Sequence, residues 1–396
     1  MIVVERQIVK EKDKRYQELD EICFLSKNLY NATLYRVRQH FFETGTYLNY
    51  HAVNKEFTDK NQNDYRALPA KVSKMTQMLV EQAFQSFFQK RKKGDRKVKI
   101  PKYLPKNGRQ VVNYTKQALS LKEKGFVKLS KTNIRLKTKV SKEVIQFVRL
   151  VPFKKHIMVE IGYKKEVEVR ERKGRYASID LGVNNLASIS SNVMPPFIIN
   201  GKPLKSMNQY YNKELAKEKS KLSKIGFQNS KRVERLHVKR KNKVNDYMHK
   251  ASRYIVNQLV SQEIDTLIVG YNKGWKQDIS MSKKNNQTFV NIPFLKLIQM
   301  LQYKCELVGI RVILTEESYT SKCSFLDNEE IKKHKSYLGS RIKRGLFQAC
   351  NGMLINADLN GSYNIMKKYL IKQEVWNERL FSDCIEVCST PVIVNL

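Results

Sequence analysis

The chain has 396 residues, enough for two or three domains, and 41% of them are hydrophobic, so it can bury sizeable cores. Its 75 Lys and Arg face 37 Asp and Glu, and the net charge of +38 favours a polyanionic partner, above all nucleic acid. The basic residues are spread along the chain, and no apolar run of about 18 residues or signal-peptide layout occurs, so no membrane role is expected.

The first half of the chain is predicted to combine short strands with two long helices. Residues 1–10 are typical of a strand, and apolar spacing predicts helices over 16–44 and 69–90, with a polar gap between them. The second helix begins at Pro69, and Met75 and Leu79 belong to its expected apolar stripe. Short alternating segments over 98–170 indicate a small β-barrel, which strand 1–10 could complete.

From Tyr176 onward the pattern changes to α/β. Two long basic helices are expected over 205–262, with a break at Gly226. A ribosomal or histone-like packing protein is the simpler alternative, but the length and the apolar runs favour an enzyme that handles nucleic acid. The order of strands and helices is that of an RNase H-like domain, with these predicted elements: strands 176–180, 186–190, 197–200, 266–270 and 311–315, and helices 294–308 and 354–372.

Two acidic residues stand out in this strongly basic chain. Asp180 ends a buried-type strand, where a carboxylate is costly unless it binds a cation, although an Asp in a turn at the strand end is the alternative. Asp358 precedes a predicted helix and could simply cap it, with Asn356 and Asn360 as neighbours that could support it. Clustered carboxylates can hold the two Mg²⁺ ions used in phosphodiester hydrolysis.

Four motifs together resemble the RuvC-type core of TnpB proteins, the RNA-guided nucleases of bacterial insertion sequences, to which Fanzor proteins and type V CRISPR effectors are similar. These motifs are Ser178–Asn184, Leu267–Lys276, Tyr319–Cys323 and Asn356–Asn364. The resemblance implies a multidomain α+β protein with a RuvC-like nuclease domain over 176–370. It also implies a wedge-like β-barrel formed by 1–12 and 95–175, a helical recognition domain over 13–94, and a tail over 371–396. Within 176–370, residues 205–262 form a basic helical insertion and 320–350 a degenerate zinc-finger-like one.

The chain departs from this family at one catalytic position. Most members have a Glu at the end of the fourth strand, where this chain has Gly270, and Asp278 lies too far beyond it to substitute. A dead nuclease is one interpretation. The other is a relocated Glu from the neighbouring parallel strand, as in Fanzor and some TnpB proteins. That match identifies Glu317, and strand alternation allows only one of Glu316 and Glu317 to serve.

A zinc site is not expected, although most relatives have a four-cysteine site in the last insertion. Only Cys323 and Cys350 remain there, without paired spacing, and Asp327 and His334 could at best complete a poor site. Scattered cysteines, including Cys384 and Cys388, are interpreted as free thiols of a reducing compartment.

Nucleic-acid contacts are expected on three basic segments. Helix 69–90 could read a DNA motif, and the cluster after it could contact phosphates or be a solvated loop. The stretch Lys213–Lys250 could follow a guide–target heteroduplex or be a solvated helix face. The candidate residues are Lys71, Lys74, Gln77, Arg91, Lys92, Lys93, Arg96, Arg232, Arg235, Lys239, Arg240 and Lys241.

These expectations combine into an Mg²⁺-dependent, RNA-guided DNA endonuclease in the bacterial cytoplasm, associated with the nucleoid. Asp180, Glu317 and Asp358 would hold two Mg²⁺ ions, and cleavage would occur next to a short transposon-adjacent motif. The expected partners are a guide RNA and double-stranded DNA, without a small-molecule substrate. A non-cleaving RNA-guided repressor is the main alternative, and a transposase is a further one.

Overall fold

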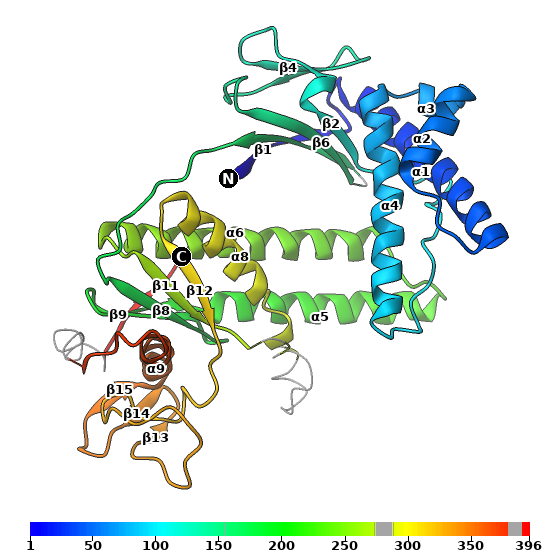
Figure 1. The fold of residues 1–396 in the computed structure, drawn as a ribbon. Helices are drawn as coiled ribbons and strands as arrows, with labels where there is room; N and C mark the ends of the chain where they lie inside the picture. Colours follow the sequence, from blue (N-terminus) through cyan, green and yellow to red (C-terminus); the bar gives the residue numbers. More distant parts are fainter. Residues whose placement is uncertain (154, 273, 275–286, 288, 379–389) are drawn as a thin grey trace. The chain divides into compact units, whose positions relative to one another are not determined.

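The computed structural model describes residues 1–153, 155–272, 274, 287, 289–378 and 390–396 (Figure 1). The chain divides into two compact units, Met1–Glu166 and Val167–Leu396. In the described parts of both units, no helix has the length and apolar character needed to cross a membrane. Asp278, Cys384 and Cys388 lie outside the described residues.

The first unit inserts its helices between the first and second strands. Strand β1 (Ile2–Lys10) pairs with β7 (His156–Lys164), so the chain start joins the later strands as expected. The described strands form two sheets, β1-β7-β6-β2 and β3-β4-β5. The other elements of this unit are α1 (Tyr16–Thr44), α2 (Tyr50–Asp59), α3 (Asn63–Arg66), α4 (Ala70–Lys92), β2 (Val112–Thr115), β3 (Leu119–Ser120), β4 (Phe126–Leu129), β5 (Arg135–Lys137) and β6 (Ile145–Phe153).

Helix α1 has the predicted bounds, whereas α2 and α3 occupy a stretch in which no helix was expected. The expected stripe of α4 is displaced by one residue. Its buried residues are Val72, Ser73, Thr76, Gln77, Val80 and Phe84, so Met75 and Leu79 lie at the margin of the contact. Gln77 is therefore fully buried, and it does not face solvent as a DNA-reading residue would.

The second unit is built on a sheet in the order β12-β11-β8-β9-β10-β16. Strands β8, β9 and β10 pair antiparallel, while β11 and β12 are parallel to β8, as the RNase H-like interpretation predicts. The predicted tail contributes β16 to the edge of this sheet, which the sequence did not reveal. The strands are β8 (Tyr176–Leu181), β9 (Asn185–Ser191), β10 (Phe197–Asn200), β11 (Thr266–Gly270), β12 (Arg311–Thr315) and β16 (Val392–Val394).

Helices cover both faces of this sheet (Figure 1). Ala177 and Ile179 of β8 share a hydrophobic core with α6 and α8, whereas Ile268 of β11 packs in the core of α9. Because side chains alternate along a strand, Ser178 and Asp180 point to the α9 face. The helices of this unit are α5 (Lys202–Lys224), α6 (Lys231–Ser261), α8 (Phe294–Leu307) and α9 (Ala357–Lys372).

A small three-stranded sheet precedes α9 and forms the finger of this unit, which we define as residues 320–356. Its strands are β13 (Ser340–Lys343), β14 (Leu346–Gln348) and β15 (Leu354–Asn356). Strand β15 runs directly into α9, so the finger and the first turn of α9 are continuous.

Candidate active site

Asp180 lies near the end of β8 and faces α9 at Gly361, in the second turn of that helix. The close approach requires a glycine, because a Cβ at Gly361 would stand 2.7 Å from Oδ2 of Asp180. A buried serine cluster lies next to this contact, where Ser178 Oγ donates to the carbonyl of Ser362 at 2.7 Å. The strand and the helix are thus held together closely at the carboxylate.

Glu317 reaches the same region from the loop after β12. Strands β11 and β12 are parallel with Gly270 opposite Thr315, so Glu317 follows two residues beyond the register partner of Gly270. A Cβ at Gly270 would stand 2.7 Å from Oε2 of Glu317 and 2.5 Å from Cδ1 of Ile365. Because Gly270 has no side chain, the Glu317 carboxylate can occupy the space beside it.

One oxygen of Glu317 has no partner among the described residues. Oε2 is buried without a hydrogen bond, whereas Oε1 accepts a long one, 3.5 Å, from Nδ2 of Asn272. Asn272 also accepts a bond of 3.1 Å from the Glu317 backbone N–H, which fixes the loop. A buried, unpartnered carboxylate oxygen is costly and is the kind of atom that a cation satisfies.

Glu316 is directed elsewhere. Its carboxylate accepts from the Ser318 backbone N–H at 2.8 Å and forms an ion pair with Lys368 of α9. Partial burial raises the pKa of Glu316, but the bonds from Lys368 and Ser318 outweigh it and lower the pKa overall. The two adjacent glutamates therefore occupy opposite sides, and Glu317 is the one near Gly270.

Asp358 lies in the first turn of α9, but it is not the capping residue considered from the sequence. Asn356 caps the helix, because its side chain accepts from the backbone N–H groups of Asp358 and Leu359. The Asp358 carboxylate instead accepts from Nδ2 of Asn185 at 2.7 Å and lies 3.8 Å from the Arg341 guanidinium. Asn360, expected to support Asp358, bonds Cys323 and Phe325 of the finger.

The electrostatics of the site reflect crowded carboxylates. The pKa of Asp180 is raised well above its ordinary value, first by burial and then by repulsion from Glu317 and Asp358. Asp180 keeps some solvent-accessible area, yet the protein around it is dense enough for desolvation to dominate. Burial, followed by repulsion from Glu316, raises the pKa of Glu317 to about 7. Glu317 and Asp358 thus both lie near enough to Asp180 for their charges to oppose ionisation of Asp180.

The donor set suits a hard cation, because Mg²⁺ prefers carboxylate oxygens and keeps several waters. In the described part of the chain, however, no three His, Cys, Asp or Glu side chains are gathered tightly enough to hold an ion as they stand. The residues fit the cation by chemistry and charge, and their oxygens have to draw closer together to bind it.

The finger is held together by hydrogen bonds around Glu329. This buried carboxylate accepts from the backbone N–H groups of Ser324 at 2.7 Å and Leu338 at 3.0 Å. Cys323 donates to the carbonyl of Lys332, while Cys350 donates to Asp327 at 2.8 Å. The two cysteines therefore have separate partners, and the donor set does not match a four-cysteine site.

His334, the remaining residue considered for zinc, also has its own contact. Its Nε2 lies 2.8 Å from the carbonyl of Glu330 within the same loop.

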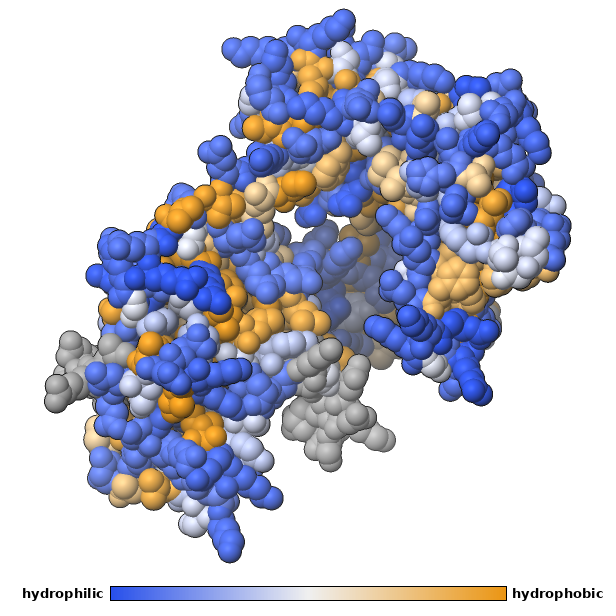
Figure 2. Space-filling model, viewed as in Figure 1, coloured by the Kyte–Doolittle hydropathy of each residue, from blue (hydrophilic) through white to orange (hydrophobic). Residues whose placement is uncertain are grey.

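Most of the candidate nucleic-acid contacts lie on the surface of the described residues. The face shown in Figure 2 is mainly hydrophilic, with scattered apolar residues. Among the candidate contacts, Arg232 is ion-paired with Glu218 at 3.1 Å and Glu214 at 3.8 Å, and it joins α5 to α6. Lys74 and Arg240 are partly buried, and the exposed candidates are Lys71, Arg91, Lys92, Lys93, Arg96, Arg235, Lys239 and Lys241.

Two family models match the chain. The OrfB_IS605 family, described as a probable transposase, matches residues 156–276, and the TNB domain of Cas12f1-like proteins matches residues 294–365. These two stretches contain Asp180, Gly270, Glu317 and Asp358. Both sides of the carboxylate site thus lie within the matched regions.

The chain is also similar to curated proteins. It is 24% identical to the TnpB-like protein ORF457 of Acidianus two-tailed virus over 54% of this chain and 46% of that protein. It is 26% identical to the CRISPR-associated endodeoxyribonuclease Cas12f2 of a Micrarchaeota archaeon over 55% of this chain and 41% of that protein. The matches thus span less than half the length of these two relatives.

A solved complex of Cas12f1 with its single-guide RNA and target DNA contains a chain of the same fold. The TM-score is 0.56 at 13% sequence identity, over 88% of this chain and 83% of that one. This likeness confirms the multidomain α+β fold with an RNase H-like core. The two family models and the curated relatives show that residues 156–276 are similar to the OrfB_IS605 family, that residues 294–365 are similar to Cas12f1-like proteins, and that the chain is similar to a TnpB-like protein.

Proposed function

We propose that the chain is an RNA-guided DNA endonuclease that cuts beside a short transposon-adjacent motif. The observation that carries this proposal is the buried, unpartnered Oε2 of Glu317, located in the space left by Gly270 and repelling Asp180. A protein with a net charge of +38 retains Asp180 there against repulsion from Glu317 and Asp358, at a cost that a cation would offset.

The three carboxylates would divide the work of holding two Mg²⁺ ions. Asp180 would lie between them, with Glu317 on one side and Asp358 on the other, and binding would relieve the repulsion that raises the pKa of Asp180. When bound, the ions supply an activated water and stabilise charge on the phosphate. Asn185 and Asn272 would orient the carboxylates of Asp358 and Glu317 through the bonds described above.

The partners would be a guide RNA and double-stranded DNA in the bacterial cytoplasm, near the nucleoid. The wedge-like part would comprise 1–12 and 95–175, with 13–94 as a recognition domain and 176–370 as the nuclease. Exposed basic residues, among them Lys71 and Arg235, would contact phosphates. Gln77 is fully buried and is left out of this proposal, whereas Arg232 is exposed but already ion-paired with Glu218 and Glu214.

The test is cleavage of a plasmid library with a randomised flank by the chain co-purified with RNA from the transposon end. We expect Mg²⁺-dependent cutting that Glu317→Gln abolishes and Glu316→Gln, the matched neighbour, retains. Cutting that survives Glu317→Gln but not Glu316→Gln contradicts the residue assignment.

A non-cleaving RNA-guided repressor is the second candidate. It is favoured by the finding that no three metal-binding side chains in the described residues are already gathered. Guide-dependent DNA binding without any cutting, in the unsubstituted chain and at any Mg²⁺ concentration, would establish this alternative.

A further inference from the structure

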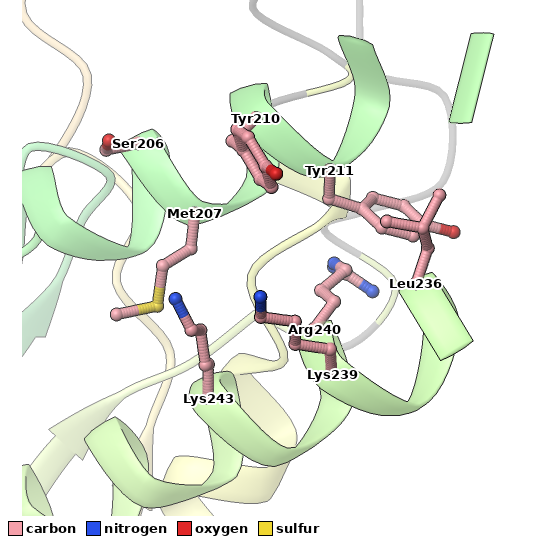
Figure 3. Close-up of a pocket in the computed structure, with 8 residues that line it drawn as sticks. All are labelled: Ser206, Met207, Tyr210, Tyr211, Leu236, Lys239, Arg240 and Lys243. Atoms are coloured by element: carbon pink, nitrogen blue, oxygen red, sulfur yellow. The ribbon is translucent and has the colours of Figure 1, made fainter. Parts of the chain in front are cut away.

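A pocket of about 350 Å³ lies between α5 and α6 in the second unit (Figure 3). Four residues of each helix line it. Helix α5 contributes Met207 and Tyr210, while α6 contributes Lys239 and Lys243, whose side chains rise toward α5. The pocket therefore has an apolar, aromatic wall and a cationic wall.

The two lysines are available for an anion. Lys239 and Lys243 are exposed, lie one turn apart on α6, and have no hydrogen bond or ion pair within the described residues. Side chains at this spacing are neighbours on a helix, so both ammonium groups can approach one phosphate. Within the described residues, neither positive charge is neutralised by an ion pair.

Arg240, between the two lysines in sequence, is fixed in the pocket wall. Its guanidinium donates to Oδ1 of Asn208 at 2.7 Å and to the carbonyl of Asn291 at 2.9 Å. It also lies 5.0 Å from the ring centre of Tyr211. Arg240 is thus held by contacts within the protein, whereas Lys239 and Lys243 can meet a ligand.

The apolar wall fits a nucleobase. Tyr210 is 58% exposed, and Met207 beside it is partly buried. Aromatic rings stack on bases of any sequence, and methionine adapts to flat apolar groups. In a duplex the base faces are already covered by their neighbours, so only an unpaired nucleotide can use this wall.

Hydrogen bonds relate the start of α5, next to the pocket, to the carboxylate site. Lys205, which precedes Ser206 of the pocket lining, donates to Oδ1 of Asn184 at 3.4 Å. Asn184 is followed by Asn185, which donates to the Asp358 carboxylate at 2.7 Å. The residue that precedes the pocket lining on α5 is thus hydrogen-bonded to the neighbour of an asparagine that contacts Asp358.

We propose that this pocket holds one unpaired nucleotide of the DNA strand that enters the carboxylate site. The base lies against Tyr210 and Met207, and its phosphate lies between Lys239 and Lys243. This inference rests on the proposed nuclease function, because that function makes a single DNA strand the ligand next to Asp358.

The test is fluorescence anisotropy of a labelled single-stranded oligo-deoxythymidine of about 12 nucleotides, a length within the site sizes of single-strand binders. The full chain is measured in EDTA over a range of salt concentrations. Lys239→Ala with Lys243→Ala is compared with Lys219→Ala with Lys224→Ala, which removes the same charge from exposed positions on α5. Circular dichroism verifies that each variant is folded.

We expect the pocket variant to raise Kd by tenfold or more and to lower the salt slope by about 0.7, the contribution of one single-strand phosphate contact. The control variant keeps Kd within threefold. Tyr210→Ala weakens binding by about 5- to 150-fold, the range for lost stacking on one base, and Tyr210→Phe restores it.

Several results overturn the inference. They are equal losses in the pocket and control variants, no measurable binding by the unsubstituted chain at low salt, an equal effect on a DNA duplex, or an effect confined to an RNA oligonucleotide. Because binding is measured without metal, a chain that binds in this way but never cuts contradicts only the proposed nuclease function.

Discussion

Replacing Gly270 by alanine tests whether the position of the Glu317 carboxylate governs activity. The new Cβ would stand 2.7 Å from Oε2 of Glu317 and 2.5 Å from Cδ1 of Ile365, against 3.4 Å for the nearest ordinary contact. The difference requires the oxygen to withdraw by about 0.7 Å, and a displacement on the order of 1 Å at a reacting centre costs about 100-fold in rate.

The same substitution has a separate and smaller effect on stability. Both crowded atoms are the ends of flexible side chains, so the fold should persist with an overpacking cost of about 1–3 kcal/mol. Ile365→Val removes the crowded methyl group but leaves the carboxylate contact. Gly270→Ala with Ile365→Val should therefore regain most of the thermal stability while cleavage stays low.

The assay is single-turnover cleavage by the guide RNA complex at saturating Mg²⁺, paired with thermal denaturation. Ile365→Val alone serves as the matched control and should cut at close to the unsubstituted rate. If Gly270→Ala cuts as fast as the unsubstituted chain, the Glu317 carboxylate is not needed where the structure places it, and the relocated triad is refuted.

Three further predictions concern the pH dependence of stability, the hydrogen bonds of the finger, and the transfer of the carboxylate from position 317 to position 270. In EDTA, the free energy of unfolding should fall as pH rises from about 4.5 to about 7, because the folded chain holds the Glu317 proton with a pKa of about 7. Urea titrations should show a smaller fall in Glu317→Gln. An equal fall in both proteins would contradict the assignment of this pH dependence to Glu317. Glu329→Ala leaves the N–H groups of Ser324 and Leu338 without acceptors, at about 1–3 kcal/mol each, so hydrogen exchange in the finger should accelerate and added Zn²⁺ should not reverse it. Gly270→Glu combined with Glu317→Ala and Ile365→Val returns a carboxylate to the end of β11. We expect this triple variant to cut DNA at least tenfold faster than Glu317→Ala. If the rate does not recover, a Glu at position 270 cannot replace the carboxylate oxygen of Glu317.

The parts of the fold that could be predicted from the sequence are those that depend on residues close together in the chain. Helix α1 shows its apolar spacing over 29 residues, and its predicted and observed bounds agree. Asp180 was identifiable because a carboxylate at the end of an apolar strand stands out in a basic chain. The break at Gly226 between α5 and α6 was equally visible, since a glycine interrupts an otherwise uniform helical stretch.

The parts that escaped prediction depend on contacts between distant residues. Strand β16 has only three residues and exists through its pairing with β10, almost 200 positions earlier. Asn185 reaches Asp358 across the site, and nothing in its own neighbourhood marks it. The register of α4 was misjudged because Ser73, Thr76 and Gln77 are polar yet buried, so hydropathy alone displaced the stripe by one residue.

Residues along one side of helix α9 contact or border each part of the site. Asp358, Gly361, Ile365 and Lys368 lie on successive turns along one side of it, and they respectively supply a carboxylate, admit Asp180, border Gly270 and hold Glu316 away. A slide of α9 by one residue moves each of them by about 1.5 Å at once. Because strand β15 of the finger leads directly into the first turn of α9, a shift of α9 along its axis changes the distance from Asp358 to Asp180 and the contacts at Gly270 and Glu316 together.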